Sequence, residues 1–279
     1  MCHLCEIRKQ IKGRRKIMRK LRVFVGLSLI LLIIFSTLAL AGEKSRLDII
    51  LERGYILVGT TGDYKPFSYL NPKTGKYEGH DIDAAKRLAK DLGVEVRFVK
   101  TTWKTLINGI LENKYDIAMC GITRTLSRAK KVGFTDPYIK VGKCPLIRKA
   151  DKDKFKTLAD IDQPGVKIGV NPGGTNEKFV RSHIKKAEII IIPKNLSIPE
   201  KLAKGEIDVM ITDNIEAIIV SKNMPELYAV SPDDPLTKDD FGYMIPRDDF
   251  AYQNWLNLWM HQMKEKGVLK QLREKWIGE

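Results

Sequence analysis

The sequence predicts an α/β fold in two lobes, each a mostly parallel β-sheet flanked by helices. Short runs of β-branched and aromatic residues alternate with amphipathic helical segments, which is typical of right-handed βαβ units. This alternation stops near residue 140 and then restarts, which indicates a second sheet. Two helical segments close the chain. We therefore expect it to cross between the lobes twice and to finish in the first lobe.

The first lobe is expected to comprise residues 42–140 and 237–279. Helix 82–92 has the clearest pattern, because its apolar residues share one face and Gly93 ends it. The other elements expected in residues 42–140 are helices 45–53 and 103–112 and strands 56–60, 94–99 and 115–120. The final section is expected to hold a strand at 242–246 and helices at 250–266 and 269–276.

The second lobe is expected to comprise residues 141–236, entered through an extended segment at 138–147. Its expected strands are 165–170, 188–192 and 209–212, and its expected helices are 158–161, 176–183 and 198–203. Ligands of open α/β sheets lie beyond the carboxyl ends of the strands, and binding sites favour domain interfaces. The cleft between the lobes is therefore the expected site.

The N-terminal segment has the pattern of an export signal. Arg19, Lys20 and Arg22 precede a mainly apolar run at 23–40, and small residues then predict cleavage after Ala41. An uncleaved membrane anchor is the alternative, because the run is nearly long enough to span a bilayer. Either Met1 or Met18 serves as the start, and Cys2 and Cys5 resemble half of a zinc site that has no second half. We expect a periplasmic or secreted protein.

Charge and cysteine content narrow the classes of function. The net charge is +15, but residues 1–41 hold nine of the 49 Lys and Arg and one of the 34 Asp and Glu, so the remainder carries +7. That modest charge, without basic tracts between aromatics, argues against a nucleic-acid partner and favours anionic small ligands. Cys120 and Cys144 either form a disulfide or remain free thiols.

Three stretches carry a family resemblance: GTTGDYKPFSY at 59–69, GHDID at 79–83, and GITRTLSR at 121–128 followed by FTDPY at 134–138. In this order they resemble the polar amino-acid-binding proteins of ABC transporters, solute-binding protein family 3. The resemblance implies a periplasmic-binding-protein-like fold of type II. Within that family, NPGGTNEKF at 171–179 looks like the cyclohexadienyl dehydratases, which convert prephenate to phenylpyruvate or arogenate to phenylalanine.

Arg128 is the first predicted substrate-binding residue. A guanidinium can donate two parallel hydrogen bonds to a carboxylate, and the matching arginine of the family binds the ligand carboxylate. A solvated arginine at a basic helix start is the alternative. Thr123 and the backbone at Gly121 are expected to add hydrogen-bond donors.

The turn at 173–176 opens a predicted helix and offers free N–H groups to an anion, so Gly174, Thr175 and Asn176 are predicted to bind substrate. Glu177 follows, at the position of the dehydratases' general acid. Because the leaving hydroxyl needs a proton, we expect Glu177 to be buried and protonated, with a raised pKa. A surface glutamate complementing the helix dipole is the alternative.

Asp213 matches the aspartate that pairs with the ligand's α-amino group in the receptors, which favours arogenate or an amino acid over prephenate. Tyr64, Phe67 and Trp103 are predicted to form apolar walls around a ring, although isolated aromatics are more often core residues. Thr125 stands where the dehydratases carry Asn and receptors usually carry Thr.

Two functions follow from the resemblance: an exported dehydratase, or a non-catalytic receptor that delivers an amino acid to an ABC permease. The sequence has no Walker A motif, no G-x-G-x-x-G, no H-E-x-x-H and no G-x-S-x-G. Its four histidines are not spaced as metal ligands. We expect no cofactor and no metal.

Overall fold

The computed structural model describes Gly13, Met18 and residues 44–278. The chain divides into two compact units, Met1–Lys44 and Ser45–Glu279. The predicted signal peptide, its cleavage site and Cys2 and Cys5 lie outside the described residues. Every helix in the described part of the chain is too short or too polar to span a membrane.

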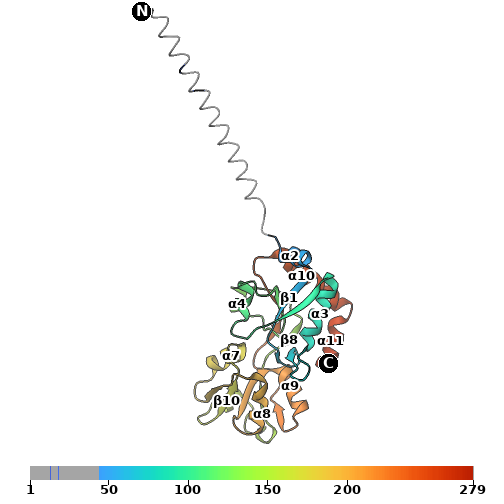
Figure 1. Ribbon diagram of the computed structural model, residues 1–279. Coiled ribbons are helices and arrows are strands. Elements are labelled where there is room, and N and C mark those ends of the chain that lie inside the picture. Colours follow the sequence, from blue (N-terminus) through green and yellow to red (C-terminus); the bar gives the residue numbers. More distant parts are fainter. Residues whose placement is uncertain (1–12, 14–17, 19–43, 279) are drawn as a thin grey trace, which may run out of the picture. The chain divides into compact units, whose positions relative to one another are not determined.

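The first lobe is built on a five-stranded sheet in the order β5-β1-β6-β15-β7. Figure 1 labels β1 of this sheet, with α3 beside it. β1 is parallel to β5 and β6, whereas β15 is antiparallel to both of its neighbours. The strands are β1 (Tyr55–Thr60), β5 (Glu95–Lys100), β6 (Ile117–Ala118), β7 (Gly133–Phe134) and β15 (Met244–Ile245). The helices are α2 (Arg46–Arg53), α3 (His80–Leu92), α4 (Leu106–Leu111), α5 (Leu126–Ala129), α10 (Phe250–Glu265) and α11 (Val268–Trp276).

The second lobe repeats this plan in the order β11-β10-β12-β9-β13, with β9 as the antiparallel strand. Its strands are β9 (Lys143–Arg148), β10 (Lys167–Val170), β11 (Glu188–Ile191), β12 (Val209–Asp213) and β13 (Leu227–Ala229). Its helices are η1 (Lys149–Asp151), α6 (Leu158–Ile161), α7 (Thr175–His183), η2 (Asn195–Ser197), α8 (Ile198–Ala203) and α9 (Asn214–Asn223). The predicted fold class is confirmed.

A third, antiparallel sheet follows β1 and was not predicted. It consists of β2 (Asp63–Tyr64), β3 (Ser68–Leu70) and β4 (Tyr77–Glu78). Strands of two or three residues are too short to show an alternating pattern, so the sequence gives no signal for them. The sheet matters because it carries Tyr64 at the inner edge of the first lobe.

Two short strands connect the lobes. β8 (Ile139–Val141) and β14 (Asp239–Phe241) pair antiparallel and form a sheet of their own. The segment predicted as one extended run at 138–147 is therefore broken at Gly142, where a Cβ would lie 1.9 Å from the carbonyl oxygen of Thr237. The lobe boundaries at 140/141 and 236/237 stay a prediction.

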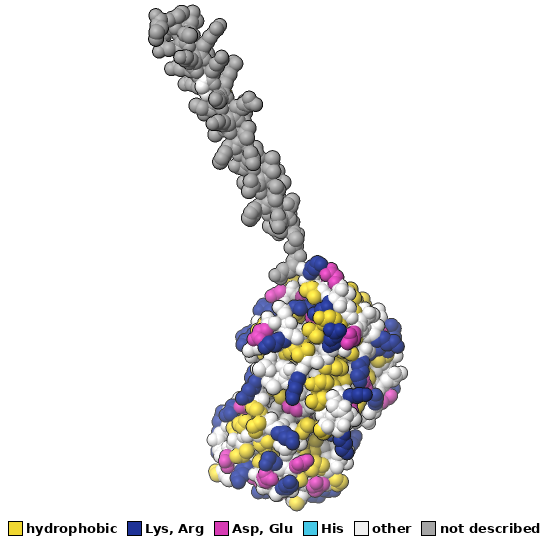
Figure 2. Space-filling view, viewed as in Figure 1, with side chains coloured by type: hydrophobic (Ala, Val, Ile, Leu, Met, Phe, Trp, Pro, Cys, Tyr) yellow, Lys and Arg dark blue, Asp and Glu magenta, His cyan; other side chains and the backbone are white. Residues whose placement is uncertain are grey.

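Apolar helix faces pack the sheets from both sides. The stripe predicted on helix 82–92 is buried in α3, from Ala84 to Leu92, against β1 and α10, the first of the two helices that close the chain. The apolar residues of the second sheet divide into two clusters, one beside α7 and one beside α8 and α9. On the face seen in Figure 2, Lys and Arg side chains are interspersed with Asp and Glu over both lobes.

Candidate active site between the lobes

A cavity of about 20 Å³ lies between the lobes. Its walls follow the carboxyl ends of β1, β6, β10 and β12, the position expected for a ligand site in open α/β sheets. Eight of its ten lining residues are predicted site residues. The lining is Tyr64, Trp103, Gly121, Thr123, Asn171, Gly174, Thr175, Asn176, Asn195 and Asp213.

A larger cleft of about 900 Å³ adjoins this cavity and shares Trp103, Asn171 and Asn195 with it. The inner cavity holds little more than a water molecule, so a ligand with a six-membered ring requires the lobes to separate. Hydrogen bonds now hold the lobes together. The Tyr64 hydroxyl donates to Asp213 Oδ2 at 2.7 Å, and Asn195 Nδ2 donates to the carbonyl oxygen of Asp63 at 2.9 Å.

Arg128 lies in α5 and is 4% exposed. Its Nη1 donates to the carbonyl oxygen of Thr123 at 2.7 Å, and it forms no ion pair with a described carboxylate. Burial lowers the pKa of its guanidinium. A buried cation with unused N–H donors is suited to an anionic ligand, because a ligand carboxylate would compensate its desolvation. Arg128 does not itself line the cavity; Thr123 lies between.

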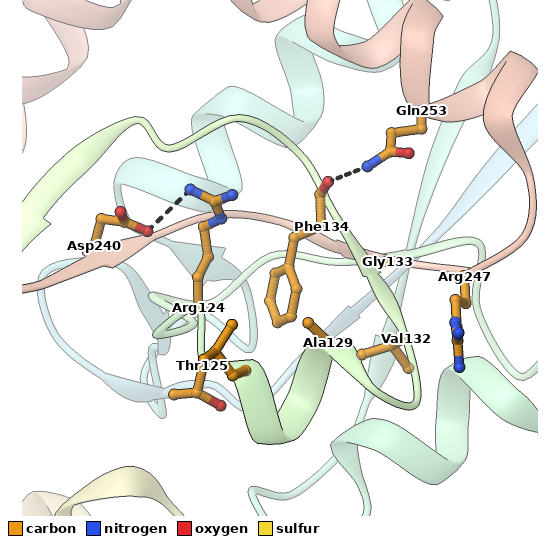
Figure 3. Close-up of a pocket in the computed structure, with 10 residues that line it drawn as sticks. Arg124, Thr125, Ala129, Val132, Gly133, Phe134, Asp240, Arg247 and Gln253 are labelled. Carbon is orange, nitrogen blue, oxygen red and sulfur yellow. Dashed lines mark hydrogen bonds and ion pairs between the residues drawn. The ribbon is translucent and has the colours of Figure 1, made fainter.

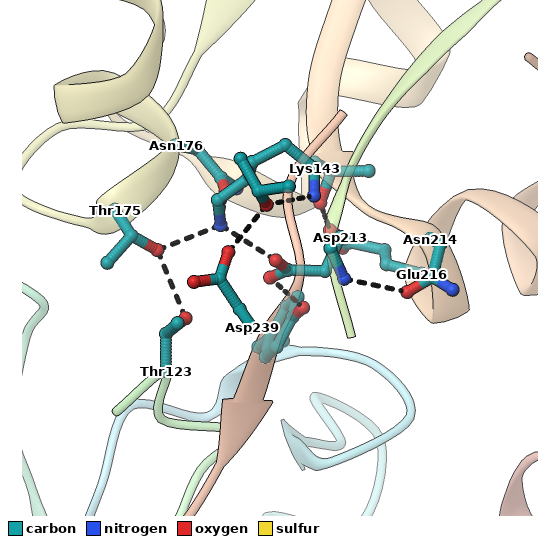
Figure 4. A network of polar contacts seen from close by, with 12 residues as sticks. Thr123, Lys143, Thr175, Asn176, Asp213, Asn214, Glu216 and Asp239 are labelled. Carbon is teal, nitrogen blue, oxygen red and sulfur yellow. Dashed lines mark hydrogen bonds and ion pairs between the residues drawn. The ribbon is translucent and has the colours of Figure 1, made fainter. Parts of the chain in front are cut away.

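A polar corner closes the cavity on the side of the second lobe (Figure 4). Lys143 Nζ donates to Asp213 Oδ1 at 2.7 Å, to Thr175 Oγ1 at 2.9 Å and to Asn176 Oδ1 at 2.6 Å. The Lys143 and Asp213 side chains are 3% and 5% exposed. Asp213 is predicted to pair with the α-amino group of a ligand. In the structure it is already paired with the ammonium group of Lys143.

Aromatic side chains form the wall on the side of the first lobe. Tyr64 meets Trp103 edge to face, with ring centroids 5.6 Å apart, and both line the cavity. Phe67 is fully buried behind Tyr64 and packs on Phe241. Of the three predicted ring contacts, two face the cavity, whereas Phe67 supports one of them from the core.

The turn before α7 approaches the first lobe closely. Gly173 has a φ of +88°, and a Cβ there would lie 2.5 Å from Cγ of Lys104. Gly174 is the N-cap of α7 and has no side chain to satisfy the N–H groups of the first turn. These free N–H groups at the positive end of the helix suit an anion.

Glu177 lies in the first turn of α7 but does not line the cavity. Gly173 N–H donates to its Oε2 at 2.6 Å, and Arg181 Nε donates to its Oε1 at 2.9 Å. The side chain is 19% exposed. The hydrogen bond from Gly173 and the neighbouring Arg181 lower the pKa of Glu177, because both stabilise the charged form. The expectation of a dry, protonated carboxyl is therefore wrong for this arrangement of the lobes.

Four residues of the site were not predicted from the sequence. Lys143 and Glu216 are buried polar residues. Asn171 and Asn195 line the cavity, and the buried Oδ1 of Asn195 has no hydrogen-bond partner among the described residues. Burial raises the pKa of the Glu216 carboxyl to about 8. Lys143 begins a strand whose next four residues are apolar, and Glu216 follows Asp213 by three residues at a helix start, so both positions carried a weak signal.

The model of the bacterial extracellular solute-binding proteins, family 3, matches residues 56–279. The chain belongs to this family.

Relatives within solute-binding protein family 3 include enzymes and receptors. The chain is 43% identical to a cyclohexadienyl dehydratase of Pseudomonas aeruginosa over 88% of its own length and 91% of the relative's. It is 28% identical to an L-cystine-binding protein of Escherichia coli over 85% and 87% of the two chains. Two solved structures are similar: an ancestral amino acid-binding protein described as a precursor of cyclohexadienyl dehydratase (TM-score 0.78, 40% identity, 84% and 100% covered) and an ancestral cyclohexadienyl dehydratase (0.54, 53%, 85% and 98%).

Thr125, the departure from the dehydratase pattern, points away from the ligand site of this family member. It lines a separate surface pocket with Arg124 and Phe134 (Figure 3). Its hydroxyl accepts a hydrogen bond from the backbone N–H of Arg128 at 3.2 Å and so caps α5. A threonine here therefore serves the helix that carries Arg128.

The remaining candidate groups are the two cysteines and the side chains that could ligate a metal. Cys120 and Cys144 are free and buried, and burial raises the pKa of both thiols, that of Cys144 to about 12. Within the described residues, no group of three or more His, Cys, Asp or Glu side chains is placed to hold a metal ion.

Proposed function

We propose that this member of solute-binding protein family 3 is a cyclohexadienyl dehydratase, which converts prephenate to phenylpyruvate and arogenate to phenylalanine. The similarity to the Pseudomonas enzyme over nearly the whole length of both chains supports this assignment. So does the similarity to an ancestral dehydratase at 53% identity.

One structural observation carries the proposal. A carboxyl group, Glu177, occupies the anion-binding end of α7 through the N–H of Gly173, beside a cavity with aromatic walls. Arg128 lies buried behind the opposite wall and has no partner among the described carboxylates. Once the lobes separate, a ring whose carboxylates face Arg128 can lie between these groups, with the hydroxyl on its opposite carbon directed toward Glu177.

The reaction needs one proton donor. The bond between the ring and its carboxylate breaks and releases carbon dioxide, and its electron pair enters the ring as the new double bond. The bond from the opposite ring carbon to the hydroxyl breaks, and the oxygen takes a proton from Glu177 and leaves as water. Aromatisation drives the step, so binding in the correct orientation and one acid suffice.

Substrate binding explains how Glu177 becomes protonated. The bound substrate excludes solvent from the Glu177 carboxyl, and its carboxylates bring negative charge nearby. Both changes raise its pKa, which favours the protonated form that a general acid requires. Its partial exposure lets solvent return the proton after each turnover.

The test is to mix purified protein with prephenate and to follow phenylpyruvate by its absorbance. Glu177→Gln keeps the shape of the side chain but cannot give up a proton. We expect it to lower kcat by about 100- to 10,000-fold, the range for loss of a general acid.

Glu188→Gln, at an exposed position in β11 of the same lobe, is the matched control and should keep wild-type turnover. Full activity in Glu177→Gln would assign the proton to another group. No turnover by the wild type, together with tight binding of an amino acid, would identify a non-catalytic receptor instead.

We further propose that the protein is exported, with the signal peptide cleaved after Ala41. The family consists of extracellular proteins, and the compact unit that holds both lobes begins at Ser45. A small carboxylate is then its partner, and an ABC permease is a partner only if the receptor function holds. N-terminal sequencing of protein from the periplasm or medium checks the cleavage point.

A further inference from the structure

Lys143 and Asp213 form a buried ion pair at the wall of the cavity. They are directly opposite each other in the antiparallel pair β9–β12, so the sheet register itself places the two side chains together. Their Nζ and Oδ1 atoms are 2.7 Å apart, and both side chains are at most 5% exposed. Such a pair keeps its charges compensated without any ligand.

The hydrogen-bond acceptors of this corner are already in use. Asp213 accepts from Lys143 through one oxygen and from the Tyr64 hydroxyl through the other. Thr175 Oγ1 and Asn176 Oδ1 also accept from Lys143, which thereby uses all three of its N–H donors. A ligand ammonium would find the charge of Asp213 already compensated and would meet the ammonium of Lys143.

Donors at the same corner remain available. The first-turn N–H groups of α7 lack a capping side chain. A carbonyl or carboxylate oxygen can therefore bind where an ammonium cannot.

We infer that Lys143 occupies the place of a ligand amino group, so that the site selects a substrate with a 2-oxo acid side chain over its 2-amino counterpart. The names of the two substrates rest on the proposed dehydratase function. For that enzyme, prephenate is then the preferred substrate and arogenate the poorer one. Asp213, which by itself favours an ammonium, is neutralised by its neighbour.

A binding experiment tests the inference without any turnover. Phenylpyruvate and L-phenylalanine differ only in the 2-oxo and 2-amino groups, and calorimetry measures the affinity of the wild type for each. We expect phenylpyruvate to bind on the order of 100-fold more tightly, the scale of a misplaced charge at a buried pair. Equal affinities, or tighter binding of phenylalanine, would overturn the inference.

A variant tests whether Lys143 causes the preference for the 2-oxo acid. Lys143→Met keeps the length of the side chain and removes its charge, so that an incoming ammonium can pair with Asp213. The ratio of the two affinities should shift toward phenylalanine by at least tenfold, and phenylalanine should raise the melting temperature of the variant more than that of the wild type. Lys167→Met, at an exposed position in β10, is the matched control and should leave the ratio unchanged.

If the folded variant Lys143→Met keeps the wild-type ratio of the two affinities, Lys143 does not cause the preference. If that variant does not fold, the double variant Lys143→Met/Asp213→Asn, which leaves no buried charge unpaired, takes its place and should lose the preference for the 2-oxo acid. A preference for phenylpyruvate in a protein that turns over neither substrate would uphold the selection by Lys143 and refute the dehydratase.

Discussion

At the scale of single residues, burial and hydrogen bonds decide which carboxyl groups hold protons. Glu177 and Glu216 both lie in the first turn of a helix in the second lobe. Glu177 has a lowered pKa because Gly173 N–H and Arg181 stabilise its charge, whereas burial raises the pKa of Glu216 to about 8. The same residue type at equivalent helix positions thus has opposite protonation states at neutral pH.

Glu216 should make stability depend on pH. Its pKa rises from 4.5 to about 8 on folding, so the folded state binds the extra proton between these values. Stability is then highest below about pH 4.5 for this group and falls as pH rises toward 8. Glu216→Gln resembles the protonated acid. It should therefore abolish this decrease in the free energy of unfolding, which amounts to about a few kcal/mol at most.

Urea unfolding at pH 5, 6.5 and 8 measures the effect. The difference in free energy of unfolding between Glu216→Gln and the wild type should grow with pH in favour of the variant. Glu226→Gln, at an exposed position, should run parallel to the wild type. Parallel curves for Glu216→Gln as well would show that Glu216 does not hold a proton in the folded state.

At the scale of elements, short helices carry the binding groups and depend on their caps. α5 has only four residues, and its first turn is closed by the Thr125 hydroxyl, which accepts from the backbone N–H of Arg128. α6 is also four residues long, and Thr157 caps it in the same way through the N–H of Asp160. The threonine hydroxyl makes the same bond in both helices, although in α6 the Asp160 side chain also accepts from the Thr157 N–H. Only α5 carries a predicted substrate-binding residue.

Thr125→Ala and Thr157→Ala therefore form a matched pair. Each should lower the free energy of unfolding by about 1 kcal/mol, the usual contribution of a helix cap. Only Thr125→Ala should also raise KM, because the backbone of Arg128 loses its anchor. Equal KM values for the two variants would mean that α5 keeps Arg128 in place without its cap.

At the scale of the whole molecule, function requires the lobes to open and close. The β8–β14 pair connects two similar sheets, and the inner cavity is too small for a ring in the present state. Gly173 lies where the lobes meet, against Lys104. Hinge motion about the connecting strands is the movement that this arrangement permits.

Gly173→Ala should obstruct closure. Gly173 and Gly165 both have positive φ values, +88° and +84°, but a Cβ at Gly165 has no atom within 4 Å. Gly165→Ala therefore introduces only the backbone strain, whereas Gly173→Ala also introduces a clash with the first lobe. We expect kcat/KM to fall at least tenfold more in Gly173→Ala, with small-angle scattering showing a more open protein when ligand is present. Similar losses in both variants would indicate that the strain alone matters.

Much of the fold could be predicted from the sequence because its signals are local. The apolar stripe of α3 and the glycine that ends this helix follow from periodicity and capping, and the structure confirms both. The strands β2, β3 and β4 could not be predicted, since they are shorter than the pattern that identifies a strand. The break at Gly142 depends on the carbonyl oxygen of Thr237, almost a hundred residues away.

The sequence by itself determined the two α/β lobes, the family, and eight residues that the fold brings to one cavity. Only the tertiary structure decided that Asp213 is paired with Lys143, that the pKa of Glu177 is lowered, and that Phe67 lies behind the wall. The physical reason is the distance along the chain over which each effect acts. Periodicity, caps and motifs act over a few residues, whereas charge compensation and desolvation depend on side chains brought together from distant strands.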